Sequence, residues 1–229
     1  MEEKFHHHPL AAARSIRLLK LAPAHTYSEP LTCELDEVRL DDKPAFDALS
    51  YVWGDSKKPE TIYCPIRPFS ITRNCDAALR RLRNSTQPCV LWIDAICIDQ
   101  TSLDERNKQV LLMPDIYKLA KRVVVWLGKG SRATGTCFTW LHRISKLNDL
   151  TMITQISDIL AKRIKKIDGE LRRTLLEGEI GKYQCFIELP FADIYFWRVW
   201  TVQEIGVAKK LTVMSGKHEV TWEDFTKAA

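Results

Sequence analysis

The chain has 229 residues, 45% of them hydrophobic and 28% charged, which is ordinary for a soluble globular protein. Its net charge is only +5, and its basic run at 162–173 lacks the interleaved aromatic residues typical of nucleic-acid binding, so we interpret it as a solvated helix face. No apolar run reaches the length of a membrane span, and the polar start does not resemble a signal peptide. We therefore expect one domain with no membrane span and no nucleic-acid partner.

The seven cysteines are scattered, odd in number and without C-x-x-C spacing. This pattern argues against a zinc site or a disulfide framework and predicts a reducing compartment, so we expect no metal and a cytoplasmic protein. A catalytic Cys–His pair stays open as an alternative. Only His142 and His218 lie far from the N-terminus, and neither has a supporting motif.

Two hairpins are predicted in the first third of the chain. Segments 15–21 and 31–40 alternate apolar and polar residues on either side of a Pro-containing turn, which indicates antiparallel strands. Because such strands are half exposed, we expect them to form an edge or an accessory layer. Segments 61–64 and 69–72 predict a second, shorter hairpin.

The first core strand is predicted at 46–53, where an apolar run ends at a Gly-Asp turn. Small and polar residues, among them Ser50 and Asp55, gather at its end. Ligands of α/β sheets bind at the carboxyl ends of strands, so this end is a candidate ligand edge. A short amphipathic helix at 77–82 follows, with Asn74 as its expected N-cap.

A second buried strand is predicted by the apolar run that starts at Cys89. Asp94 lies at its carboxyl end, and Asp99 continues into a polar loop. The strand–helix–strand order implies crossover connections and a parallel sheet. We therefore expect the strand ends at 50–55 and 94–100 to open on the same edge.

Ser102 and Glu105 form a capping-box pattern that predicts a helix to about residue 121. Pro114 lies in its middle and should kink the helix or split it in two. The next buried strand is expected at 122–127. The expected inner stripe of the helix is Val110, Met113, Tyr117 and Ala120.

The last third of the chain reads as a helical insertion at 133–178, a strand at 211–214 and the start of a helix at 222–229. Between them, 195–206 is apolar on nearly every face, which is the pattern of a buried helix. A helix ending so abruptly suggests a piece of a longer protein.

Glu204 is the only carboxylate of the 195–206 helix, and it shares a face with Trp197 and Trp200. Burying a carboxylate is costly unless it is paired or used. One interpretation is a structural pair with Arg198. The other is a functional site.

Three blocks together resemble the fungal heterokaryon incompatibility (HET) domain: ALSYVWGD (48–55), LWIDAICIDQ (91–100) with ERNKQV (105–110), and RVWTVQEI (198–205). The intervening segments 71–83 and 116–128 are similar too. This sequence departs from the family pattern at Asp99, where Asn is more usual, and at Pro114, where Gly is. Neither departure touches the centres of the three blocks.

The resemblance implies a role in self/non-self recognition that triggers cell death, usually as the N-terminal part of a larger cytoplasmic protein with further domains. HET domains resemble TIR domains, which implies a flavodoxin-like α/β fold. Some TIR domains hydrolyse NAD with one glutamate in a W-x-x-x-E helix, and Trp200 to Glu204 match that pattern. The expected organisation is one domain over 1–229, made of a β extension (1–45), a βαβ core (46–130), a helical insertion (131–190) and a Glu-bearing C-terminal part (191–229).

Cleavage of the nicotinamide–ribose bond of NAD needs only one carboxylate, because nicotinamide is already a cationic leaving group and no acid has to protonate it. Ordinary glycosidases use two carboxylates. Glu204 would bind ribose hydroxyls and stabilise positive charge at the anomeric carbon. Trp53 or Trp200 would stack on nicotinamide. The expected substrate contacts are Ser50, Tyr51, Trp53, Asp55, Asp94, Asp99, Arg106 and Trp200.

NAD is then a substrate, and no prosthetic group is expected; the chain has no G-x-G-x-x-G motif or P-loop. We expect activity to depend on self-association into a homo-oligomer. The alternative is a non-enzymatic module that nucleates cell-death assemblies through its surface. In either case, we expect Glu204 to face a pocket shared with Trp53, Asp94 and Trp200.

Overall fold

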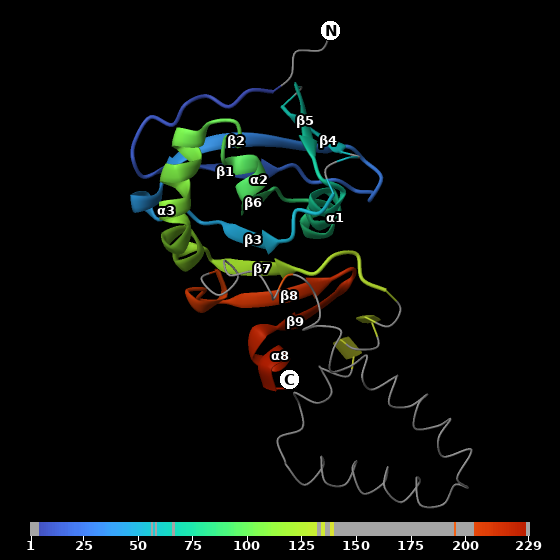
Figure 1. Cartoon of the computed structure of the whole chain (residues 1–229). Helices are drawn as coiled ribbons and strands as arrows, with labels where there is room; N and C mark the ends of the chain where they lie inside the picture. The colour runs from blue at the N-terminus through green and yellow to red at the C-terminus, as the bar shows by residue number, and fades with distance from the viewer. Residues whose placement is uncertain are drawn as a thin grey trace, which may run out of the picture.

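The computed structural model describes residues 5–55, 57, 59–65, 67–131, 134, 135, 138, 139, 195 and 204–227. These residues form a mixed α/β structure built on one sheet (Figure 1). Nearly all of the expected helical insertion, and Trp197, Arg198 and Trp200, lie outside the described residues.

The strands and helices are short, and most follow the predicted segments. The strands are β1 (Ser15–Leu21), β2 (Leu31–Arg39), β3 (Asp47–Tyr51), β4 (Glu60–Cys64), β5 (Arg67–Ile71), β6 (Cys89–Trp92), β7 (Arg122–Trp126), β8 (Leu211–Ser215) and β9 (His218–Thr221). The helices are the 3-10 helix η1 (Leu40–Asp42) and α1 (Arg73–Leu82), α2 (Asp94–Cys97), α3 (Leu103–Leu119) and α8 (Trp222–Lys227).

The described strands form a nine-stranded sheet in the order β5-β4-β2-β1-β6-β3-β7-β8-β9. Its centre, β6-β3-β7-β8, is parallel, as the strand–helix–strand order predicted. Val123 to Val125 of β7 are fully buried, because side chains alternate between two covered faces in a central parallel strand. Antiparallel strands extend the sheet on both sides, so it is mixed rather than wholly parallel.

The first hairpin is confirmed, but its expected place at an edge is wrong. β1 pairs with β2 on one side and with β6 on the other, so it lies inside the sheet. Arg17 made the strand look half exposed, yet its side chain is 6% exposed because Glu105 pairs with it. A charged residue at an alternating position therefore concealed a buried strand.

Helix α1 begins one turn earlier than predicted, and the expected N-cap at Asn74 is wrong. Thr72 is the N-cap, and its hydroxyl accepts a hydrogen bond from the Cys75 N–H at 3.2 Å. Asn74 lies inside the helix, and its side chain forms hydrogen bonds with residues at the ends of β3 and β7 instead of capping the helix. Its amide donates to the Val52 carbonyl at 2.6 Å and its oxygen accepts from the Trp126 indole at 2.9 Å.

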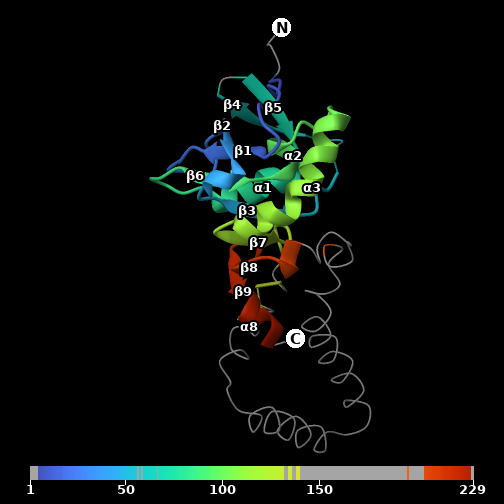
Figure 2. The same cartoon turned by 90° about the vertical axis from the view of Figure 1, so that its left-hand side faces the viewer.

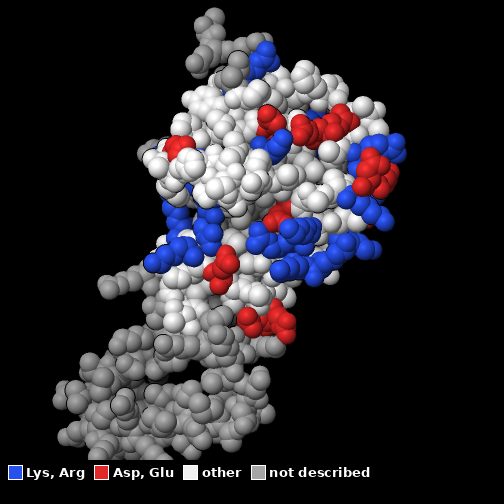
Figure 3. Space-filling model, turned by 180° about the vertical axis from the view of Figure 1, so that it is seen from behind, with Lys and Arg blue, Asp and Glu red and all other residues white. Residues whose placement is uncertain are grey.

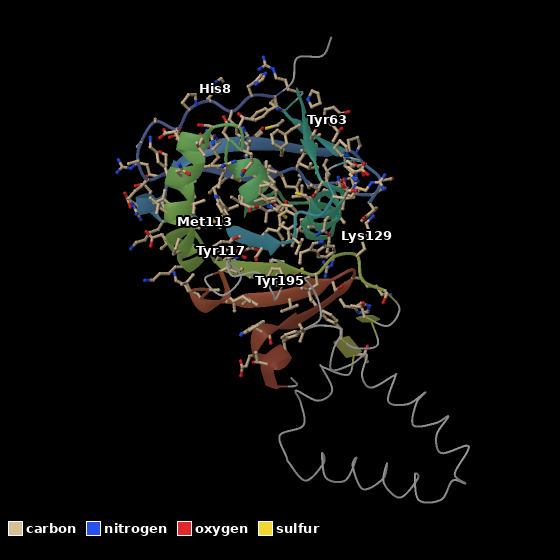
Figure 4. The ribbon with its side chains drawn as sticks, in the orientation of Figure 1. His8, Tyr63, Met113, Tyr117, Lys129 and Tyr195 are labelled. Carbon is tan, nitrogen blue, oxygen red and sulfur yellow. The ribbon has the colours of Figure 1, made fainter. Side chains whose placement is uncertain are left out.

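Helix α3 starts at the predicted cap, where the Ser102 hydroxyl accepts a hydrogen bond from the Glu105 N–H at 3.2 Å. The helix is continuous through Pro114 and is not split (Figure 1). The expected stripe is partly wrong, because Val110 is 37% exposed. Tyr117, labelled in Figure 4, is correctly placed. It is buried, and its ring packs edge-to-face against Trp92. The residues of α3 that are buried are Gln109, Leu112, Ile116 and Tyr117.

The end of the chain contains a strand that the sequence did not predict. After β8, a turn through Gly216 reverses the chain into the four-residue β9, which pairs antiparallel with β8. Gly216 has φ +55°, a left-handed conformation that glycine adopts without strain. α8 follows β9 at the end of the sheet that lies farthest from β5 (Figure 2).

Among the described residues, no helix is long and apolar enough to cross a membrane. Seen from behind, Lys and Arg side chains gather in a band across the middle of the described part (Figure 3). Several charged side chains of the described residues are paired; the Arg122 guanidinium, for example, contacts the Asp47 carboxylate at 2.6 Å.

Candidate functional site

The candidate site is organised around the carboxyl end of β3. Ser50 and Tyr51 are the last two residues of this strand and are both buried. Neighbouring residues of a strand point to opposite faces of the sheet. The end of β3 therefore contributes one polar side chain to each face.

On one face, Ser50 meets the carboxylate of Glu204. The Ser50 hydroxyl donates a hydrogen bond to Glu204 Oε2, and it lies 2.6 Å from the Tyr195 hydroxyl. A serine hydroxyl has a single proton, which Ser50 donates to Glu204, so the Tyr195 O–H donates to Ser50. Glu204 is 5% exposed. The result is a buried carboxylate held by a chain of two hydroxyl groups.

Tyr195 brings this chain together from a distant part of the sequence. Its ring is fully buried (Figure 4), and its hydroxyl reaches Ser50 across 145 residues of sequence. Tyr195 had no predicted role, although it begins the same apolar stretch that contains Glu204. The one sequence signal for a role of Tyr195 is its hydroxyl within an apolar stretch, because buried tyrosine hydroxyls usually have a hydrogen-bond partner.

On the other face, Tyr51 lies against α1 and α2. Its hydroxyl interacts with the Cys75 thiol, and burial raises its pKa well above the ordinary value, with Cys75 and Asp94 adding to the shift. Burial likewise raises the pKa of Cys75 to about 12. Both groups are therefore neutral at physiological pH, and neither Tyr51 nor Cys75 is an ionised nucleophile in this state.

Trp53 and Asp94 form the second polar pair of the expected site. The Trp53 indole N–H donates to both Asp94 oxygens, at 3.1 and 3.0 Å. Asp94 begins α2 and also accepts from the Ala95 N–H at 2.7 Å. The contact fixes the orientation of the Trp53 ring, which is 38% exposed and therefore available for stacking.

A cavity of about 370 Å³ opens beside this pair, within the range of small-molecule sites. Ser50 and Glu204 are not among the described residues that line it. Its floor and walls combine aromatic rings with polar loop residues. The lining includes Phe5, His7, Trp53, Phe69, Cys75, Asp99, Gln100 and Thr101.

The N-terminal segment forms one wall of this cavity, which the sequence did not signal. His7 Nε2 lies 2.7 Å from the Ile96 carbonyl oxygen, and its ring packs edge-to-face against Phe5 and Phe69. Burial lowers the pKa of His7, so the neutral ring is favoured. No local sequence pattern links His7 to this cavity, because His7 and Ile96 are 89 residues apart in the chain.

Three other residues that were expected to contact the substrate either accept hydrogen bonds from the nearby backbone or lie at the surface. Asp99 accepts from the Thr101 N–H and hydroxyl, at 2.9 and 2.7 Å; burial opposes ionisation, but these bonds prevail and its pKa is lowered. Asp55 is exposed and accepts from the Lys57 N–H at 2.9 Å. Arg106 is exposed on α3.

The loop from α2 to α3 is held by a buried ion pair. Glu105 accepts from Arg17 Nη1 at 2.5 Å, from Arg17 Nη2 at 3.0 Å and from the Asp99 N–H at 2.8 Å. Arg17 also donates to the carbonyls of Cys97 and His8. Burial opposes ionisation of Glu105, but these bonds lower its pKa. One ion pair thus connects β1, the N-terminal segment, α2 and α3.

The described contacts of the expected site therefore form two groups. Glu204 and Ser50 share one face of β3 with Tyr195. Trp53, which donates to Asp94, borders the cavity together with Asp99. Trp200 lies outside the described residues, so the expected single pocket around it stays a prediction. Within the described part of the chain, no group of three or more His, Cys, Asp or Glu side chains is placed to hold a metal ion.

These features define a mixed α/β domain with a buried carboxylate beside the end of a central parallel strand. The profile described as "Heterokaryon incompatibility protein (HET)" matches residues 46–204, and the chain belongs to this family. The match begins beside β3, so β1 and β2 precede the matched region although they complete the sheet.

The chain is similar to heterokaryon incompatibility protein 6, OR allele, of Neurospora crassa, with 42% identity over 214 residues. The similarity covers 82% of this chain and 31% of that protein, so the chain spans less than a third of the relative's length. No solved structure matches the chain.

Proposed function

We propose that this HET domain is a cell-death module of fungal self/non-self recognition and that it cleaves the nicotinamide–ribose bond of NAD with Glu204. The observation that carries the enzymatic part is the buried carboxylate of Glu204, held by the Ser50 hydroxyl. The similarity to a heterokaryon incompatibility protein supports the biological role. The resemblance of HET to TIR domains supports the choice of substrate.

The hydroxyl chain suits Glu204 to the proposed step. A carboxylate offers about four acceptor positions, so Glu204 can accept from Ser50 and from ribose hydroxyls at the same time. As nicotinamide leaves, positive charge grows at the anomeric carbon, and a nearby carboxylate stabilises it strongly in a buried setting. Ser50 and Tyr195 fix the carboxylate before the substrate arrives, which avoids reorganisation during the step.

The cavity beside Trp53 supplies the features that a flat heterocycle requires. The exposed part of the Trp53 ring offers a stacking surface, and Gln100 offers an amide edge. The indole is held in place by Asp94, so little side-chain freedom is lost on binding. In this proposal Trp53 offers a stacking surface at the carboxyl end of β3, and Glu204, on the other face of that strand, acts on the ribose.

A non-enzymatic assembly module is the second candidate, and a surface feature favours it. Leu103 is 63% exposed and Leu111 is 81% exposed on α3. They are eight positions apart, which at about 100° per residue places them about 80° apart around the helix, so both lie on its exposed side. Exposed leucines of this kind suit self-association, which the enzymatic proposal also requires for activation.

The two candidates are separated by following nicotinamide release from NAD at increasing protein concentration. We expect activity that rises faster than the protein concentration. Glu204→Gln keeps the size of the side chain and its bond to Ser50 but removes the charge, so we expect it to fold and to lose at least about 100-fold in rate.

The matched control is Glu219→Gln, the same change at a side chain that is 53% exposed on β9. It should retain wild-type activity. Activity that persists in folded Glu204→Gln would remove Glu204 from the mechanism. Wild-type protein without activity at every concentration, combined with concentration-dependent assembly that Leu111→Asp abolishes, would favour the non-enzymatic module.

A further inference from the structure

Cys33 and Cys64 occupy neighbouring positions on two adjacent strands. β2 and β4 are parallel, with Leu31 beside Ile62 and Thr32 beside Tyr63. One residue further along this register, Cys33 lies beside Cys64. Adjacent strands are about 4.8 Å apart, and disulfide-bonded residues have Cα atoms about 4.4 to 6.8 Å apart, so the backbone spacing permits a cross-link.

The two side chains point to the same face of the sheet and interact. Both residues are buried and both are free thiols. The thiol–thiol hydrogen bond is the largest influence on each: it raises the pKa of Cys33 and lowers the pKa of Cys64. One thiol of the pair is thus favoured as the thiolate, and the other stands next to it as the proton donor.

Each cysteine also borders a hollow that is open to solvent. Cys64 lines a cavity of about 530 Å³ together with Arg17 and Arg67, and Cys33 lines one of about 370 Å³ together with Lys20. Small oxidants can therefore approach the pair. The hydrogen bond with Cys33 prevails and lowers the pKa of Cys64, although burial and the carboxylates of Glu34 and Asp36 act to raise it. The thiolate is the form that reacts with oxidants.

We propose that Cys33 and Cys64 form a reversible disulfide when the protein meets a hydroperoxide. In the first step, the Cys64 thiolate attacks the O–O bond, becomes a sulfenic acid and releases hydroxide or an alkoxide. In the second step, Cys33 sulfur displaces the sulfenic oxygen, which leaves as water after taking up a proton. Two thiols lose two electrons and two protons in total, the peroxide accepts both electrons, and thiol reductants reverse the reaction.

The cross-link would close a loop that contains β3. Residues 33 to 64 include Ser50, which contacts Glu204, and Trp53, which borders the cavity. A disulfide restricts the unfolded chain and so favours the folded state. The inference does not depend on the proposed NAD chemistry, because it concerns strands β2 and β4 only.

The test treats the purified chain with hydrogen peroxide, blocks the remaining thiols, digests the protein under non-reducing conditions and maps the linked peptides by mass spectrometry. We expect a peptide pair joined through Cys33 and Cys64, a thiol count that falls by two from the seven of the reduced chain, and full recovery with dithiothreitol. The thermal unfolding midpoint should rise by several degrees on oxidation and return on reduction.

Cys64→Ala should abolish this cross-link, and Cys89→Ser should retain it, because Cys89 is on β6, away from the pair. Should Cys64→Ala fail to fold, the wild-type peptide map alone still decides. Peroxide-treated protein in which Cys33 and Cys64 remain thiols would overturn the proposal, as would a dominant link from either of them to another cysteine, such as the buried Cys97.

Discussion

The buried ion pair between Arg17 and Glu105 offers the sharpest test of how the candidate site is held. The Arg17 side chain is 6% exposed and the Glu105 side chain 13%. Glu105→Ala removes the acceptor of two guanidinium hydrogen bonds and of the Asp99 N–H. The guanidinium then stays buried with only the carbonyls of Cys97 and His8 as partners.

The expected cost follows from these contacts. Removing one partner of a buried ion pair destabilises a protein by about 3–5 kcal/mol, because the other charge is left uncompensated. The two remaining carbonyls offset part of this, while the Asp99 N–H loses its acceptor at a cost of about 1–3 kcal/mol. We therefore expect Glu105→Ala to lower the free energy of unfolding by about 4 kcal/mol, a large share of the ~5–15 kcal/mol of a typical domain.

The measurement is equilibrium unfolding in urea, followed by tryptophan fluorescence. The matched control is Lys108→Ala on the same helix, which breaks an ion pair of 2.7 Å whose side chains are 67% and 80% exposed. Exposed pairs contribute about 0–1 kcal/mol, so the control should change little. The double variant Arg17→Met with Glu105→Leu removes the uncompensated charge but leaves the Asp99 N–H without its acceptor, so it should recover part of the lost stability. Equal effects of Glu105→Ala and Lys108→Ala would refute the reasoning.

The remaining predictions concern acid stability, a turn and a helix cap. The pKa of Glu105 is lowered in the folded state, so ionised Glu105 stabilises the fold fully above the ordinary pKa of 4.5. This stabilisation is lost as the pH falls through the folded pKa. Urea midpoints measured from pH 7 to 3 should therefore decline less steeply in Glu105→Gln than in the wild type. Gly216→Ala should destabilise by at least about 1 kcal/mol, because φ is +55° and the new Cβ would lie 2.4 Å from the Lys129 carbonyl oxygen. Gly206→Ala is its control, since its Cβ would meet nothing within 4 Å, and equal thermal midpoints for the two variants would contradict the turn argument. Thr72→Ala should cost about 1 kcal/mol by loss of the N-cap, and unchanged chemical unfolding would show that the cap contributes nothing.

Local patterns determined most of the elements. Alternation predicted β1 and β2, the apolar runs predicted β6 and β7, and the Ser102 cap predicted the start of α3, because each of these signals lies within a few neighbouring residues. The family resemblance likewise rests on short blocks, and the match over 46–204 confirms it. The same patterns singled out Ser50 and Glu204, which the structure brings into contact across 154 residues.

Only the tertiary structure decided which polar side chains meet. β1 pairs with β6 and lies inside the sheet, not at the expected edge, with Arg17 buried on it. The amide of the buried Gln109 donates to the Ser15 carbonyl, so the inner face of α3 includes a polar residue. The hydroxyl of Tyr195, the wall formed by His7 and the adjacency of Cys33 and Cys64 also depend on strand order and register. In each of these pairings the two residues are distant in the sequence. A single sequence carries no local signal for them, because neither residue contacts its own sequence neighbours in the way that a helix or strand pattern would reveal.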